Sequence, residues 1–143
     1  MLQTVINTLC SHAKWKMPQQ NTQGQYTFFL DNNVEFSLFS PNGQDCIFLV
    51  KIADIPHGNE GESFIQNIAA KAAGMYKIKK SIVSIRDNAV YLHRLVLKQE
   101  INQERILQTA KEILNDADIW HTALTHGSSQ NSPFSFSMAG MKF

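Results

Sequence analysis

The sequence is poor in cysteine, carries little net charge and has no long hydrophobic run. Its 143 residues include two cysteines, Cys10 and Cys46, whose separation does not match metal-binding spacings, so we expect free thiols. With 13 basic and 12 acidic residues the net charge is +1, which excludes the basic surface that dominates nucleic-acid binding. No apolar run reaches the length of a membrane span, and the first residues lack the pattern of a secretory signal. We therefore expect a cytoplasmic protein without a nucleic-acid or membrane partner.

The sequence also lacks the spacings that build catalytic sites. It contains no glycine-rich phosphate loop, no nucleophile elbow and no His-Glu-x-x-His motif. His121 and His126 are five positions apart, which misses the same-face spacing of a helical metal pair. His93 alternates with apolar residues in a predicted strand, where we expect a structural role. We predict that the protein is not an enzyme and uses no cofactor or metal; a deep pocket pairing His93 with an acidic group would reopen the enzyme hypothesis.

Three consecutive strands are predicted in the first half of the chain. Residues 25–31 and 34–40 have strand-like patterns, and the intervening Asn32-Asn33 tolerates the positive φ angles of a tight hairpin. Pro41-Asn42-Gly43 supplies a second turn before a third strand at residues 45–52. This order predicts an antiparallel meander.

The predicted meander is apolar on more than one face. Phe28 and Phe36 fall on one face, whereas Phe29 and Phe39 fall on the other among polar neighbours. The third strand is apolar on both sides, with Phe48, Val50 and Ile52 opposite to Ile47 and Leu49. The second face therefore needs a cover, which could be a helix of the same chain, a second copy or a client polypeptide.

Helical periodicity predicts three helices around these strands. The first covers residues 2–13. Residues 54–61 are rich in turn formers and are expected to form a surface loop, after which the second helix begins at Ser63, which resembles an N-cap with Gln66 in a capping-box pattern. The small residues of the second helix are expected to pack on the sheet of the same chain, with a symmetry-related copy as the alternative. The last helix follows Asn102 as its cap, and Gly127 can close it.

Two further strands complete a predicted sheet of five. They cover residues 81–86 and 89–97 and are joined by Asp87-Asn88. The element order α-β-β-β-α-β-β-α predicts an α+β fold on a five-stranded antiparallel sheet. We expect a single domain over residues 1–127 and a flexible Ser/Phe-rich tail over residues 128–143, in which Phe134 and Phe136 could add an edge strand.

This order and size resemble the class I type III secretion chaperones, the Tir chaperone-like family of small bacterial cytoplasmic proteins. The resemblance covers residues 2–124 and rests on the first helix, the meander, the capped central helix, the hairpin and the last helix. It implies a homodimer that binds an extended segment near the N-terminus of a secreted effector. It also implies that binding keeps the client soluble and secretion-competent, and that the chaperone itself uses no cofactor or ATP.

The resemblance and the pattern together suggest two sets of site residues. Candidates for client contact are Val5, Leu9, Phe29 and Phe39, for which the alternative is a place in the intramolecular core. Family members commonly associate through the central helix and neighbouring strands, which here correspond to Ile65, Ile68, Ala72 and Met75. A heterodimer with a related chaperone and a general interaction module of the same fold without a secretion role remain alternatives.

Overall fold

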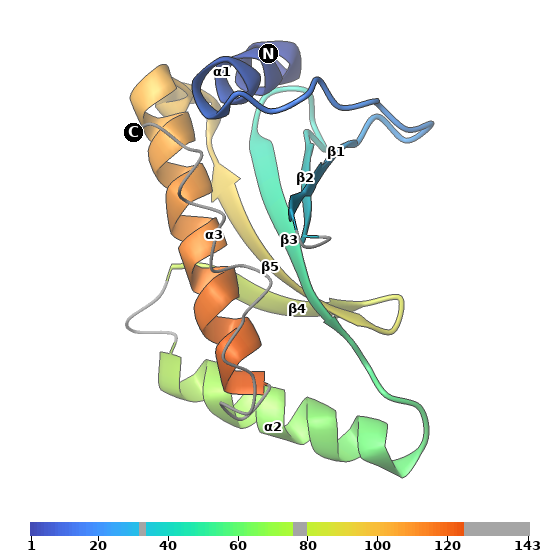
Figure 1. Cartoon of the computed structure of the whole chain (residues 1–143). Coiled ribbons are helices and arrows are strands. Elements are labelled where there is room, and N and C mark those ends of the chain that lie inside the picture. The colour runs from blue at the N-terminus through green and yellow to red at the C-terminus, as the bar shows by residue number, and fades with distance from the viewer. Residues whose placement is uncertain (32–33, 76–79, 125–143) are drawn as a thin grey trace.

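The computed structural model describes residues 1–31, 34–75 and 80–124. These residues contain three α-helices and five strands in the predicted order, which confirms the α+β prediction, and one short 3-10 helix in addition (Figure 1). Their bounds are α1 Leu2–Ala13, β1 Tyr26–Leu30, β2 Val34–Phe39, β3 Cys46–Asp54, α2 Asn59–Met75, β4 Ile82–Arg86, β5 Ala89–Val96, η2 Lys98–Glu100 and α3 Gln103–Leu124. No helix within these described ranges combines the length and apolar character that a membrane span requires.

The five strands form a single antiparallel sheet in the order β1-β2-β3-β5-β4. Among the described strands, β1 and β4 are therefore the two edges of the sheet. The predicted tight turn between β4 and β5 is confirmed, because Asp87 and Asn88 both have positive φ angles. A bulge between Lys51 and Ala53 shifts the pairing of β3 with β5, and β3 extends two residues beyond its predicted end.

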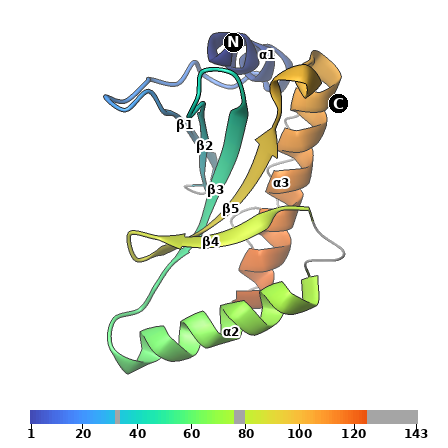
Figure 2. The same ribbon diagram turned by 180° about the vertical axis from the view of Figure 1, so that it is seen from behind.

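One face of the sheet, called here the inner face, lies against α3 and forms the core. Its side chains come from alternate strand positions and are buried together with those of α3 and α1. Four aromatic rings pack together on this face. The ring centroids of Trp15 and Phe28 are 5.0 Å apart, and those of Phe36 and Phe48 are 5.9 Å apart. Figure 2 shows α3 along this face and α1 across one end of the sheet.

Local backbone and side-chain features mark the start of α3 and the end of α1, both close to their predicted positions. The side-chain oxygen of Asn102 accepts a hydrogen bond from the Arg105 backbone N–H at 2.8 Å, which confirms Asn102 as a helix cap. Lys14 follows α1 with a positive φ of 58°, so the chain turns sharply there and leads into the segment before β1.

The position of α2 corrects two predictions. The helix begins at Asn59 rather than at Ser63, since Gly61, which suggested a loop, lies in its first turn close to the carbonyl of Pro56. A Cβ on Gly61 would come within 2.3 Å of that oxygen, so the close approach requires glycine here. In addition, α2 does not lie on the sheet but crosses beyond its end (Figures 1 and 2), and most of its small residues are exposed: Ala69, Ala70, Ala73 and Gly74.

Some predictions fall outside the described residues. These are the Asn32-Asn33 turn, the closure of α3 at Gly127 and the tail over residues 128–143. The division into a domain and a tail therefore stays a prediction.

Candidate functional site

The outer face of the sheet, opposite to α3, carries an apolar row that runs across three strands. Strand pairing places Phe39 beside Ile47, and Ile47 beside Leu95, so the three side chains form one line across β2, β3 and β5. Leu95 is 51% exposed, and Phe39 and Ile47 are half-buried. An apolar line of this kind on an open sheet face is typical of a surface that another polypeptide covers.

The neighbouring row of the outer face continues this surface toward β4. Leu49 pairs with His93, and His93 pairs with Ile82, which is 59% exposed. At the β1 end the same row is polar, since Thr27 and Ser37 share a hydrogen bond of 3.0 Å. From β2 to β4, two adjacent rows therefore form a continuous apolar part of the outer face.

His93 is held as a structural histidine on this face. Its Nδ1 atom lies 3.3 Å from the Ser84 hydroxyl, and partial burial lowers its pKa. The cavity described below is lined by other residues. The described part of the chain also contains no group of three or more His, Cys, Asp or Glu side chains that could hold a metal ion.

Strand β1 presents an edge beside the segment of residues 14–21 that precedes it. Gln20 pairs with Tyr26, and the Asn21 N–H donates to the Gln25 carbonyl at 2.9 Å. Main-chain groups point alternately to the two sides of a strand, so those of Phe29 point to the same side as those of Gln25. Beyond Tyr26 no described strand pairs with β1 on this side, which leaves Phe29 as an available donor and acceptor.

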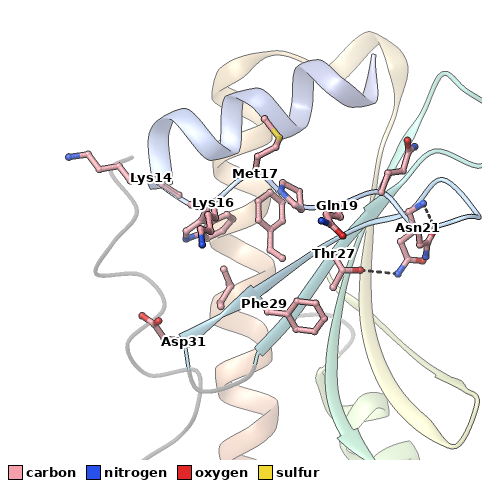
Figure 3. Close-up of a pocket in the computed structure, with 15 residues that line it drawn as sticks. Lys14, Lys16, Met17, Gln19, Asn21, Thr27, Phe29 and Asp31 are labelled. Atoms are coloured by element: carbon pink, nitrogen blue, oxygen red, sulfur yellow. Dashed lines mark hydrogen bonds between the residues drawn. The ribbon is translucent and has the colours of Figure 1, made fainter.

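A groove of about 990 Å³ lies between this segment and β1 (Figure 3). Met17 and Phe29, which are 54% and 74% exposed, lie on its two sides. Trp15 also lines the groove while its ring packs on Phe28, so it anchors the segment to the inner face. The groove therefore has apolar walls and one hydrogen-bonding edge, which is the combination that an added strand uses.

Charged groups line the groove as well. Lys14 and Lys16 come from the segment after α1, and Asp31 lies at the other end of the β1 edge from Gln25. In Figure 3 the two lysines and Asp31 lie toward one end, whereas Gln19 and Asn21 lie toward the other. The groove thus has a charged end and an uncharged polar end.

The structure separates the four residues predicted for client contact into two groups. Phe29 and Phe39 lie on the outer face as expected, but Val5 and Leu9 are completely buried. The expectation that Val5 and Leu9 contact a client does not fit this burial, because the apolar side of α1 packs inward against α3 and the sheet. Both residues lie in the core of the chain, which was the alternative expectation for them.

The residues predicted for self-association lie along α2 but do not share one environment. Ile65 is 38% exposed and Ala72 is half-buried, whereas Ile68 is buried against the core of its own chain. Met75 is the last residue of α2, and its side chain lies outside the described part. Of these residues, Ile65 and Ala72 have side-chain surface that is accessible to solvent.

Sequence reasoning missed the groove itself. Trp15 and Met17 were not among the candidates, because they belong to no periodic pattern. The signal that could have found them is the presence of two large apolar residues, separated by Lys16, in the otherwise polar segment that leads to Pro18.

No protein-family model matches this chain, and no curated protein matches it. Solved structures do match. One is a chain of the ExsC–ExsE complex, with a TM-score of 0.68 at 13% identity over 86% of this chain and 92% of that chain. Another belongs to the HopA1–SchA chaperone–effector complex, with a TM-score of 0.64 at 10% identity over 84% and 92% of the two chains.

A third match is the Yersinia pestis type III secretion chaperone SycH in complex with a stable fragment of YscM2. Its TM-score is 0.55 at 7% identity over 82% of this chain and 97% of that chain. An uncharacterized protein from Methanothermobacter thermautotrophicus also matches, with a TM-score of 0.63 at 12% identity over 90% and 100%. The chain therefore has the fold of class I type III secretion chaperones, as the resemblance implied.

Proposed function

We propose that this protein is a type III secretion chaperone that binds an extended segment near the N-terminus of a secreted effector. By covering that segment it keeps the effector soluble and secretion-competent. The observation that carries the proposal is the apolar outer face together with the β1 edge, which no described strand covers beyond Tyr26, on a fold shared with chaperones solved in complex with their partners.

The client segment binds as an added strand along β1. Its backbone pairs with the main-chain groups of Phe29, and alternate client side chains reach Met17 on one wall and the Phe29 ring on the other. Farther along, the client crosses the apolar row that contains Phe39. Backbone pairing supplies affinity for an unfolded chain, and the apolar contacts select its pattern. No chemical step, cofactor or nucleotide is needed.

Two copies associate in the bacterial cytoplasm through α2. The helix lies beyond the end of the sheet, with Ile65 exposed and Ala72 half-buried on its surface. Ile68 attaches α2 to its own chain and so fixes the direction in which the helix projects. Met75 completes the predicted set at the end of the helix. A related chaperone could replace the second copy at the same surface.

The test is a pull-down of the tagged full-length protein from its native cytosol, with identification of the partner and limited proteolysis of the complex. We expect a dimer that holds one partner and protects only a short segment near the partner's N-terminus. Replacement of Phe29 and Phe39 together by Ser should abolish this protection while the melting temperature stays within a few degrees of the original.

The matched control is Ile119→Ser, which removes a 40% exposed apolar side chain from α3, away from the outer face. This variant should bind the partner normally. Equal loss of binding in both variants, or unfolding of the Phe29/Phe39 variant, would show that the proposed surface is wrong.

A second candidate is a general interaction module of the same fold without a secretion role. The match to an uncharacterized protein shows that the fold alone does not establish a secretion role. The pull-down separates the two functions. A folded partner with no protected terminal segment would favour the module.

A further inference from the structure

We propose that the chain's own segment Phe134–Met138 occupies the β1 groove when no client is bound. The inference rests on the proposed function in one respect, since it makes this segment a competitor for the client's site. The groove and its unpaired edge are described above; the occupant is identified from its sequence, its reach and its lack of charge.

The segment has the side-chain pattern of an edge strand. Phe134, Phe136 and Met138 alternate with Ser135 and Ser137, so an extended backbone would place all three apolar side chains on one face. The residue before it is Pro133, and proline is tolerated at the first position of an edge strand.

A long connection joins the segment to the end of α3. Nine residues, 125–133, separate the end of α3 at Leu124 from Phe134. Nine extended residues span up to about 30 Å. The 22 residues of α3 rise by about 33 Å, so the connection can run back along most of that helix toward β1.

The chemistry of the groove fits this segment. Phe29 offers its N–H and carbonyl to an incoming backbone and exposes 74% of its side chain beside them. A cross-strand aromatic partner such as Phe134 or Phe136 would cover that ring and stabilise the pairing of the two strands. Residues 128–138 carry no Asp, Glu, Lys or Arg, so binding them at the edge desolvates no charge.

Occupancy by this segment would protect the edge strand. An unpaired strand edge beside an exposed Phe is a template for pairing with other chains, and an internal strand removes it until a client arrives. The client then displaces a segment present at high effective concentration. The apparent affinity for the client therefore equals the intrinsic affinity multiplied by the fraction of molecules whose groove is free.

The experiment is residue-resolved amide hydrogen exchange on the client-free, full-length protein. It compares the original sequence with a Phe134→Ser/Phe136→Ser variant. We expect exchange at Phe29 to be slower by about tenfold or more in the original sequence. Phe28 serves as an internal reference, because its main-chain groups point toward β2 and should exchange equally in both proteins.

The control variant is Met141→Ser/Phe143→Ser, which removes two apolar residues from the same region but leaves the alternating segment intact. It should exchange like the original. Fast exchange at Phe29 in all proteins would overturn the proposal, as would slow exchange in all of them. Protection that moves to the β4 edge would also overturn it. None of these outcomes involves a client, so the proposed chaperone function is tested separately by the pull-down.

Discussion

The two faces of one sheet show how the same strands can serve stability and recognition. Phe28 and Phe29 are neighbours in β1, yet Phe28 is 3% exposed and Phe29 is 74% exposed. The inner face has a cover, α3, whose apolar side is buried against it. The outer face has an equally apolar row but no described element upon it. Apolar residues alone therefore do not define a core; a covering element of the same chain is also needed.

The ion pairs on the two faces differ in the same way. On the inner face, Arg94 is 6% exposed and donates to Glu112 of α3 at 2.7 Å. On the outer face, Lys51 contacts Asp54 at 2.8 Å, and the Asp54 side chain is 79% exposed. A buried arginine depends on its partner, whereas an exposed pair exchanges readily for contacts with water.

The largest expected difference is between two Phe-to-Ala substitutions in one hairpin. Phe36→Ala should lower the free energy of unfolding by about 4 kcal/mol, because it leaves a cavity among fully buried rings. Phe29→Ala should cost less than about 1 kcal/mol, since most of that ring is already in water. Urea denaturation of both variants measures the difference. Similar losses would mean that the outer face is covered in solution.

The next largest difference in stability is expected between the loss of the Arg94–Glu112 pair and the loss of the Lys51–Asp54 pair. Glu112→Ala should cost about 2 kcal/mol, because it leaves the Arg94 guanidinium buried without its carboxylate. The matched Asp54→Ala should change stability by less than about 0.5 kcal/mol. Chemical denaturation at pH 7 measures both values. A cost for Asp54→Ala as large as that for Glu112→Ala would contradict the distinction between the faces.

The pH dependence sharpens this comparison. Partial burial alone would raise the pKa of Glu112, but hydrogen bonds from Arg94 and Gln108 hold it below its ordinary value of 4.5. A carboxyl with a lowered pKa in the folded state stabilises the protein fully above that ordinary value and loses the contribution as the pH falls below it. The stability gap between the original protein and Glu112→Ala should therefore narrow below about pH 4.5. A gap that is constant from pH 7 to pH 3 would exclude this coupling.

Most of the fold could be predicted from the sequence because its signals are local. The range of α1, the Asp87-Asn88 turn and the Asn102 cap follow from periodicity, positive φ angles and side-chain capping, and the structure bears them out. The start of α2 could not be predicted in this way. Gly61 looked like part of a loop, and only its approach to Pro56 explains a glycine within the first helical turn.

The candidate site was less predictable because it depends on what lies beside each strand. Alternation places Phe29 and Phe39 on the outer face, and the structure agrees. For Val5 and Leu9 the sequence left client contact and the core as alternatives, since periodicity shows that a helix has an apolar side but not which neighbour covers it; the structure buries both side chains. The groove beside β1 was missed for a similar reason. It arises from sheet order and from the course of residues 14–21, neither of which is a local property.

The smallest expected effect on stability concerns the cap of α3, the helix that covers the inner face. Asn102→Ala removes the acceptor for the Arg105 N–H at the start of α3 and should cost about 1 kcal/mol. The control is Asn115→Ala, at an exposed position within the same helix, where alanine should be neutral or slightly stabilising. Urea denaturation measures both, and amide exchange in the first turn of α3 should be faster in Asn102→Ala only. Equal stabilities for the two variants would mean that packing of α3 on the sheet fixes the start of the helix without help from its cap.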